Sequence, residues 1–307
     1  MAHPLQPDPA VLGNLDRLVA MARQEDLGGG DVSSVVVPAG AVVRGRFVAR
    51  EPLVACGAAM LGAIAGAYDS GIETDVRVSE GAQVAPGDVL AEWRGPARAV
   101  LAAERVALNF LQRLCGIATV TAAYVEAVAG TAAGIYDTRK TIPGWRQLDK
   151  YAVRVGGGRN HRMGLYDAVL VKDNHLAILA AGGCPDPLAE AGRRLAGVRG
   201  RLGAGGFVEV EVDGLEQFEA ALALDVDVIL LDNMPPAALR QAVRMRDAAG
   251  VAGRIELEAS GGITLANVRA AAESGVERIA IGALTHSVRA ADIALDIEAR
   301  SGRRDHR

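Results

Sequence analysis

The chain has 307 residues, of which half are hydrophobic and 23% are charged. That length suits one large domain or two smaller ones, and the composition is ordinary for a globular protein. Thirty-three basic and 37 acidic residues give a net charge of −4, so a chain-wide basic field for binding nucleic acid is absent.

The sequence also indicates the cellular compartment in which the protein functions. The first residues do not combine a basic region with an apolar run, and no apolar stretch approaches the ~20 residues needed to span a bilayer. The cysteines Cys56, Cys115 and Cys184 are widely spaced and odd in number, which favours free thiols in a reducing compartment. We therefore expect a cytoplasmic protein with neither a membrane nor a nucleic-acid partner.

The first part of the chain predicts two helices around a β-rich region. An Asp-Pro pair at position 8 is typical of a helix N-terminus, and that helix should end at the glycines 28–30. Residues 42–48 alternate in hydrophobicity, which predicts a strand. Turn signals within 80–95 predict a hairpin like that of a lipoyl-type carrier, although no lysine lies at its turn. A long helix follows at 97–119.

From residue 134 onward, short β-rich runs alternate with helical segments, which predicts parallel strands joined by helical crossovers. The six strand regions are 134–140, 167–173, 207–213, 227–233, 254–262 and 278–284. Polar residues gather at the C-terminal end of nearly every one. An α/β barrel builds its active site at those ends, whereas an open doubly wound sheet would spread them along a line. The pattern favours the barrel.

A basic cluster lies at the start of this second region. Between Asp137 and Lys172 there are eight Lys or Arg against three Asp. A solvated face of one helix accounts for Arg146, Lys150 and Arg154 at helical spacing.

The remaining cations call for another explanation. Arg139, Lys140 and Lys172 end strands, and Arg162 lies in a loop next to glycines. Cations that converge on one barrel mouth repel each other unless an anion lies among them. The implied ligand carries several negative charges, and planar guanidinium groups suit carboxylates or phosphates.

Acidic residues also fall on the predicted strands. Glu209 and Glu211 share one face of a strand, and Glu256 and Glu258 share one face of another. Structural ion pairs with the basic set are one role open to Glu209, Glu256 and Glu258. Glu211 and Asp232 lie nearest their strand ends, where they could hold ribose hydroxyls or waters on Mg²⁺.

Small residues follow the last two strands. Ser260, Gly261 and Gly262 precede a predicted helix, and Gly282 with Ala283 follows the next strand. Backbone N–H groups in such strand-to-helix loops can form a phosphate cradle, although plain tight turns would give the same pattern.

Together these segments resemble the quinolinate phosphoribosyltransferase family. The stretches that carry the resemblance are 25–34, 104–119, 137–175, 208–217, 230–233, 259–263 and 282–287. The block 137–175, DTRKT through KDNH, is the most specific of them. Cys115 and Trp145 depart from the residues more common in the family, at positions without a catalytic role.

The resemblance implies an α/β fold with an N-terminal α/β sandwich domain and an incomplete α/β barrel. The sandwich would span 1–118 and the barrel 119–287, with a C-terminal helix at 288–307 packing back on the first domain. It also implies a homodimer or a dimer-based hexamer.

The resemblance further implies the chemistry. Phosphoribosyl would pass from phosphoribosyl pyrophosphate to quinolinate, with Mg²⁺ as cofactor, giving nicotinate mononucleotide, CO₂ and pyrophosphate. The residues implied around the quinolinate carboxylates and the phosphates are Arg105, Thr138, Arg139, Lys140, His161, Arg162 and Lys172. Glu211 and Asp232 would serve the ribose and the metal, directly or through water, and share the catalytic role with Lys140. The 5-phosphate would lie on Ser260, Gly261, Gly262, Gly282 and Ala283.

Three rival interpretations remain. A paralogue associated with molybdate transport would share the fold without this turnover. A non-carboxylating nicotinate phosphoribosyltransferase would need fewer cations, because its substrate has one carboxylate. An anion-binding protein without turnover would have little use for the inward carboxylates Glu211 and Asp232.

Overall fold

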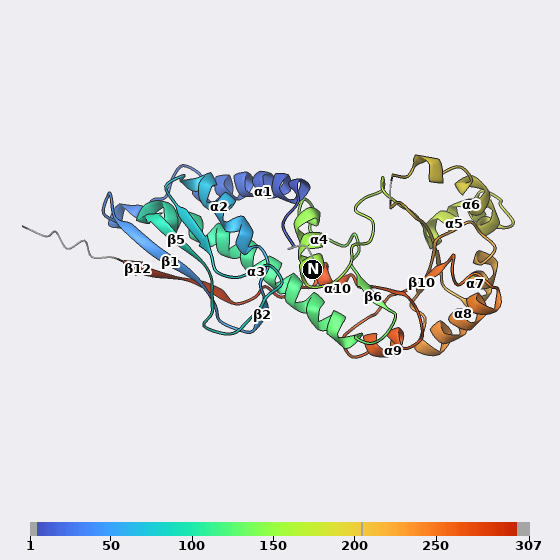
Figure 1. Ribbon diagram of the computed structural model, residues 1–307. Helices are drawn as coiled ribbons and strands as arrows, with labels where there is room; N and C mark the ends of the chain where they lie inside the picture. The colour runs from blue at the N-terminus through green and yellow to red at the C-terminus, as the bar shows by residue number, and fades with distance from the viewer. Residues whose placement is uncertain (1–4, 204, 300–307) are drawn as a thin grey trace, which may run out of the picture. The chain divides into compact units, whose positions relative to one another are not determined.

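The structure is a computed structural model that describes residues 5–203 and 205–299, and it divides into two compact units (Figure 1). Unit 1 comprises the described residues up to Ala122, the segment 141–157 and the residues from Leu284 onward. Unit 2 comprises 123–140 and 158–283. The segment 141–157 lies in the range that we assigned to the barrel, yet by its contacts it groups with unit 1.

Unit 1 is built on a four-stranded antiparallel sheet with the order β12–β1–β5–β3, and β2 pairs separately with β4. Its strands are β1 (Val42–Ala49), β2 (Leu53–Val54), β3 (Glu73–Val76), β4 (Gln83–Val84), β5 (Val89–Pro96) and β12 (Ile293–Ala299). Its helical elements are α1 (Pro9–Leu27), η1 (Ser33–Val36), η2 (Ala58–Met60), α2 (Leu61–Tyr68) and α4 (Arg146–Val155). Two helices cross the division between the units, α3 (Ala97–Ala127) and α10 (Ala283–His286).

The sequence signals at the start of unit 1 are confirmed. The Asp8 side chain accepts hydrogen bonds from the N–H groups of Ala10 and Val11, both at 3.0 Å, and caps α1 as expected. The alternation in β1 turns Val43 and Phe47 inward. Phe47 meets Trp93 of β5 edge to face, with ring centroids 4.8 Å apart, so a cross-strand aromatic pair anchors the core of the sheet.

Two expectations for unit 1 are wrong. β4 and β5 do not form the hairpin predicted within 80–95, because β4 pairs with β2 and β5 lies between β1 and β3. The helix expected within 288–307 is, over 293–299, the strand β12, antiparallel to β1. Its sequence IALDIEA alternates apolar and other residues with the period of a strand, and its remaining residues, 300–307, lie outside the described part.

The interpretation of α4 as a solvated basic helix also needs correction. Lys150 is fully buried, and Arg146 and Arg154 are only partly exposed. Helix α4 packs against α1 in unit 1, and the neighbouring Asp149 pairs with Arg113 at 2.8 Å. Residue spacing alone could not show that the basic positions of this helix turn inward.

Helix α3 is long and apolar enough, by length and composition, to cross a membrane. However, 61% of its most apolar window is buried inside the protein, as in the core helix of a folded domain. It is the one helix of this kind in the part of the chain that the structure describes.

Unit 2 is the incomplete α/β barrel that we expected, with a six-stranded parallel sheet in the order β6–β11–β10–β9–β8–β7. All six strand regions are confirmed, as β6 (Gly134–Tyr136), β7 (Val169–Val171), β8 (Val208–Val212), β9 (Val228–Asp232), β10 (Glu256–Ser260) and β11 (Arg278–Ala280). The helical elements between them are α5 (Asp173–Ala181), α6 (Pro187–Leu195), η3 (Arg199–Arg201), α7 (Leu215–Ala221), α8 (Pro236–Ala248) and α9 (Val268–Ala272). Figure 1 shows helices α5 to α9 around the outer side of these strands.

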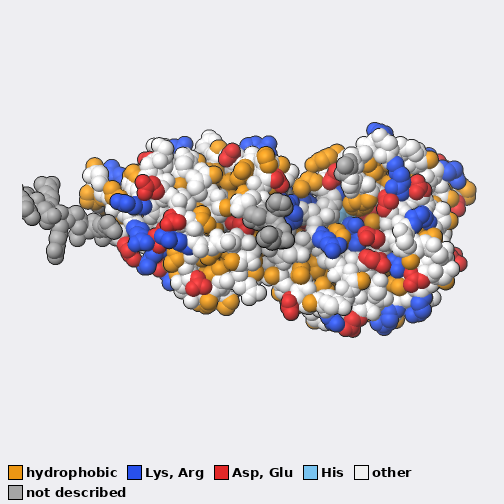
Figure 2. Space-filling view, viewed as in Figure 1, with side chains coloured by type: hydrophobic (Ala, Val, Ile, Leu, Met, Phe, Trp, Pro, Cys, Tyr) orange, Lys and Arg blue, Asp and Glu red, His pale blue; other side chains and the backbone are white. Residues whose placement is uncertain are grey.

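The two faces of the barrel strands differ in chemistry. On β8, Val208, Val210 and Val212 are buried on one face, whereas Glu209 and Glu211 occupy the other. On the surface shown in Figure 2, basic and acidic side chains are interspersed over both units, in keeping with the small net charge. The unusual charges are therefore those on the inner face of the barrel.

One prediction concerns a close approach in unit 1. A Cβ on Gly116 of α3 would lie 2.3 Å from the carbonyl oxygen of Arg289. We expect Gly116→Ala to lower the free energy of unfolding by about 1–3 kcal/mol, because the backbone of this segment cannot yield as a flexible side chain would. The matched control is Gly13→Ala in α1, where nothing lies within 4 Å of the added Cβ; it should stabilise by roughly 0.5–1 kcal/mol. Urea unfolding of both variants measures the difference, and equal stabilities would contradict the packing argument.

Candidate active site

The inner face of the barrel carries polar side chains in layers. In the register of the parallel strands, Asp232 lies opposite Ser260, and Ser260 lies opposite Ala280. Glu211 of β8 lies on the same face of the sheet as Asp232 of the neighbouring strand β9. The C-terminal ends of β8, β9 and β10 therefore bring Glu211, Asp232 and Ser260 to one mouth, as the sequence predicted.

The predicted cations of unit 2 surround this mouth from the loops. Lys172 follows β7 and places its Nζ 2.8 Å from Glu211 Oε2. Thr138, Arg139 and Lys140 follow β6, and the Thr138 hydroxyl accepts a hydrogen bond from the Lys140 N–H at 3.1 Å. Thr138 and Arg139 are half-buried and Lys140 is exposed.

Arg162 is the most deeply placed of these cations, with 8% exposure. Two carboxylates hold the loop on either side of it. Asp137 accepts from the His161 N–H at 2.9 Å, and Asp167 accepts from the Met163 N–H at 2.6 Å. Burial, and then the neighbouring positive charge of Arg139, lower the pKa of Arg162. The two arginines thus lie close enough to repel each other, which is the convergence that implies an anionic ligand.

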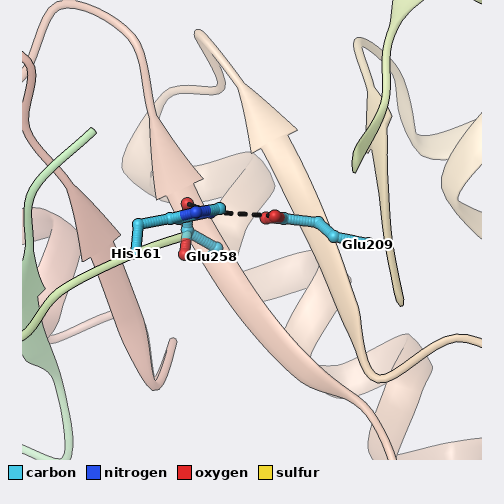
Figure 3. A group of neighbouring side chains, drawn as sticks. All are labelled: His161, Glu209 and Glu258. Carbon is cyan, nitrogen blue, oxygen red and sulfur yellow. Dashed lines mark ion pairs between the residues drawn. The ribbon is translucent and has the colours of Figure 1, made fainter. Parts of the chain in front are cut away.

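Below the mouth, His161 lies between two fully buried carboxylates from β8 and β10 (Figure 3). Its Nε2 is 2.9 Å from Glu209 Oε2 and 3.4 Å from Glu258 Oε1. Its Nδ1 accepts a hydrogen bond from the Arg162 N–H at 2.7 Å. Both ring nitrogens of His161 are therefore engaged within the protein, and the ring is only 8% exposed.

Arg278 completes this cluster from β11. Its Nε is 2.7 Å from Glu258 Oε2, and its guanidinium lies over the Tyr136 ring, 4.1 Å from the centroid. Glu256 is more distant, with an oxygen 3.5 Å from Arg278 Nη1. The ion-pair role that the sequence left open for Glu209, Glu256 and Glu258 is confirmed by these contacts.

The cluster offers three potential metal ligands. One ligand atom from each of His161, Glu209 and Glu258 lies within 4.8 Å of the others, and no other such group occurs among the described residues. Arg278 already supplies a full positive charge to Glu258, however, and Nε2 of His161 already lies 2.9 Å from Glu209 Oε2. We therefore interpret the group as a charge-balanced ion-pair network.

Protonation in this network follows from burial and charge. Burial, followed by the negative charge of Glu258, raises the pKa of Glu209. Burial alone would lower the pKa of His161, but the hydrogen bonds to Glu209 and Glu258 outweigh it and raise that pKa to about 9. Because Nδ1 accepts the Arg162 N–H, Nε2 carries the ring proton that faces Glu209, and a second proton is shared within the His161–Glu209 pair. The raised pKa values of both partners keep this second proton bound at neutral pH.

The glycine loop after β10 adopts a conformation that other residues rarely adopt. Gly261 and Gly262 have φ values of 90° and 61°. The helix that we expected directly after them begins only at Val268, so the loop does not lie at a helix start. Gly282 and Ala283 follow β11 immediately, where α10 begins.

Sequence reasoning did not assign a role to Asn233, which follows Asp232 at the end of β9. Its side-chain amide donates to Asp232 Oδ2 at 2.7 Å, and its N–H donates to the Ser260 carbonyl at 2.9 Å. A signal was present in the sequence, because Asn is among the few residues that tolerate a left-handed conformation at a strand end. Its φ is 53°.

Arg105 belongs to the other unit of the chain. It lies on α3 in unit 1 and is exposed. Every other predicted site residue belongs to unit 2.

Known proteins share this arrangement over nearly the whole chain. Two domain families match it, the quinolinate phosphoribosyl transferase N-terminal domain over residues 31–115 and the C-terminal domain over 117–296. The chain is 46% identical to a nicotinate-nucleotide pyrophosphorylase [carboxylating] of Mycobacterium leprae, covering 91% of this chain and 95% of the relative. It is 40% identical to a probable enzyme of the same name from Bacillus subtilis, covering 89% and 90%. The crystal structure of NadC from Streptococcus pyogenes superposes with a TM-score of 0.85 at 33% identity, covering 98% of this chain and 100% of that one.

The buried proton makes a prediction about pH. His161 has an ordinary pKa near 6.5 when unfolded and a folded pKa of about 9, so the stabilisation is complete below pH 6.5 and is lost as the pH rises through 9. We expect the free energy of unfolding to fall by about 1 kcal/mol per pH unit between pH 7 and 9 from this pair. His161→Gln should remove that slope, whereas His286→Gln, at an exposed histidine of unit 1, should leave it. Urea unfolding at three pH values distinguishes them, and identical slopes in all three proteins would contradict the shared proton.

Proposed function

This chain belongs to the quinolinate phosphoribosyltransferase family, and we propose that it performs the carboxylating nicotinate-nucleotide pyrophosphorylase reaction of NAD biosynthesis. It transfers phosphoribosyl from phosphoribosyl pyrophosphate to quinolinate, and the products are nicotinate mononucleotide, CO₂ and pyrophosphate. The observation that carries the proposal is the convergence of Arg139 on the buried Arg162 beside the carboxylate-lined mouth. A dicarboxylate among these cations relieves their repulsion.

The quinolinate side of the site is the cationic side. Arg139 and Arg162 hold the two carboxylates, and Lys140 and Lys172 add charge toward the diphosphate. In this structure Lys172 pairs with Glu211, so substrate binding exchanges one partner of Lys172 for another. His161 acts here through its contact with the Arg162 N–H.

The phosphoribosyl side of the site lies on β8 to β11. Glu211 and Asp232 face the ribose hydroxyls, and the loops Ser260–Gly262 and Gly282–Ala283 present backbone N–H groups to the 5-phosphate. Two carboxylates on adjacent strands fit Mg²⁺, which keeps several waters and takes its remaining ligands from substrate phosphates. When bound, Mg²⁺ would neutralise charge that develops on the departing pyrophosphate.

The protein's contribution to the chemistry is mainly position and charge. The pyridine nitrogen of quinolinate has a free lone pair, so its attack on the ribose C1 needs no general base. The bond from C1 to pyrophosphate breaks through an oxocarbenium-like state, and Lys140 with its neighbouring cations stabilises the leaving group. The ring nitrogen is then positively charged, so the C2 carboxylate leaves as CO₂ and a proton replaces it on the carbon.

The site is completed, in this proposal, by Arg105 of a second subunit. Arg105 is exposed on α3, and Leu101 lies one helical turn before it with 38% exposure. In the same unit Val32 and Val36 are 86% and 84% exposed, and they line one surface cavity of about 520 Å³ together with Leu101. Exposed apolar side chains of this kind on the unit that carries Arg105 support a homodimer interface.

A single assay tests the reaction. Purified protein should release CO₂ from carboxyl-labelled quinolinate only when phosphoribosyl pyrophosphate and Mg²⁺ are both present. Folded protein that releases no CO₂ would overturn the proposal in favour of a paralogue or an anion-binding protein. Release of pyrophosphate from phosphoribosyl pyrophosphate with nicotinate, and not with quinolinate, as the acceptor would instead identify the non-carboxylating enzyme.

The shared site makes a prediction of its own. Arg105→Ala and Lys140→Ala should each be inactive alone. Mixed under conditions of subunit exchange, they form heterodimers in which one of the two sites has both residues intact. With random pairing, about a quarter of wild-type activity should return.

The control is a mixture of Lys140→Ala with Arg139→Ala, two residues of the same unit. Each site in that heterodimer lacks one residue, so activity should not return. Failure of the first mixture, with exchange shown by differently tagged subunits, would place Arg105 outside the partner's site.

A further inference from the structure

We infer that Asn233 is a positioning residue that sets the Asp232 carboxylate and the Ser260–Gly262 loop in one fixed geometry. The inference rests on the proposed function, because it concerns how the phosphoribosyl side of that site is held. Asn233 lies at the end of β9, directly after Asp232 and beside the end of β10.

The backbone of Asn233 is the first observation. Its φ of 53° is the one positive value at a non-glycine residue within the described ranges 5–203 and 205–299. Residues other than glycine adopt this region at a cost and mostly at functional sites. The Asn233 N–H donates to the Ser260 carbonyl at 2.9 Å, which ties the residue to β10 in this conformation.

The side chain of Asn233 is the second observation. Its Nδ2 lies 2.7 Å from Asp232 Oδ2. A carboxylate oxygen can only accept, so this end of the amide must be the NH₂ group. The charge-assisted hydrogen bond fixes the orientation of Asp232 and occupies one of its oxygens, which leaves the other for ribose or metal-bound water.

The opposite end of the same amide lies against the glycine loop. A Cβ on Gly261 would lie 2.2 Å from Asn233 Oδ1 and 2.9 Å from the Asn233 nitrogen. Only glycine permits this approach, and its φ of 90° is also one that L side chains rarely adopt. One side chain therefore contacts both the carboxylate and the loop, so the two cannot shift independently.

Two substitutions separate the backbone of Asn233 from its side chain. Asn233→Gly accepts the left-handed backbone without strain and removes the amide. Asn233→Asp retains the shape and tolerates the same φ, but it replaces the donor with a carboxylate oxygen that faces Asp232. Asn267→Gly is the matched control, because Asn267 braces the same loop by donating to the Gly262 carbonyl at 3.0 Å and accepting from the Thr264 N–H at 2.8 Å.

The experiment measures steady-state CO₂ release as a function of phosphoribosyl pyrophosphate, quinolinate and Mg²⁺, together with thermal unfolding. For Asn233→Gly we expect an unfolding midpoint at or above that of wild type. Its kcat/KM for phosphoribosyl pyrophosphate should fall about 10- to 100-fold, the loss typical of one charge-assisted hydrogen bond. The KM for quinolinate should not change, because the contacts of Arg139 and Arg162 are untouched.

For Asn233→Asp we also expect a loss in kcat/KM for phosphoribosyl pyrophosphate, because a carboxylate oxygen cannot donate to Asp232 and repels it. Asn267→Gly leaves the hydrogen bond to Asp232 in place and should lose less. A residue with a merely structural role would lower the unfolding midpoint and would not separate the kcat/KM for phosphoribosyl pyrophosphate from the KM for quinolinate.

Each other outcome decides against the inference. If Asn233→Gly retains the wild-type kcat/KM, the positioning role is wrong while the proposed function stands. An equal loss of kcat/KM in Asn267→Gly, or a loss in Asn233→Gly that follows its unfolding, would reduce Asn233 to a structural residue. If wild-type protein neither releases CO₂ nor binds phosphoribosyl pyrophosphate with Mg²⁺ by calorimetry, the proposed function and this inference both fail.

Discussion

Two fully buried carboxylates, Glu209 and Glu258, impose the central constraint on unit 2. An ionised carboxylate in a protein interior is costly unless cations and hydrogen bonds compensate it. Arg278 reaches Glu258 from the next strand, and His161 reaches both carboxylates from a loop. The charged side chains of the barrel interior are therefore paired in one specific arrangement, which a purely apolar core would not require.

This network links the interior of the barrel to its mouth. The Nε2 atom of His161 contacts the buried carboxylates, and its Nδ1 accepts a hydrogen bond from the backbone N–H of Arg162. The backbone of Arg162 is thus held by His161, and its buried guanidinium donates to the Ala168 carbonyl at 3.3 Å. Such preorganisation avoids ordering a long side chain during binding. The same principle applies to Asp232, which Asn233 orients from the other end of the mouth.

The sequence predicts most of what strand periodicity and strand ends control. The six strands, the mouth residues Glu211 and Asp232 and a barrel-like arrangement follow from a period of two and from polar residues at strand ends. That the barrel is incomplete is implied only by the family resemblance. The sequence predicts less well the features that depend on tertiary packing. Lys150 has the spacing of a solvated helix residue and is buried, and β12 has the strand period in a segment expected to be helical. The conformation of Asn233 depends on the hydrogen bond from its N–H to the Ser260 carbonyl of β10, and the sequence around Asn233 does not predict that contact.

The edge strand β12 affects how the protein can be made. Its residues pair with β1 from Val43–Ala299 to Ala49–Ile293, so the two partners are synthesised far apart in time. All six strands of unit 2 emerge from the ribosome between them. The barrel can therefore form while β1 still has a bare edge, and an unpaired edge invites pairing with other chains. In the completed sheet β12 covers that edge of β1.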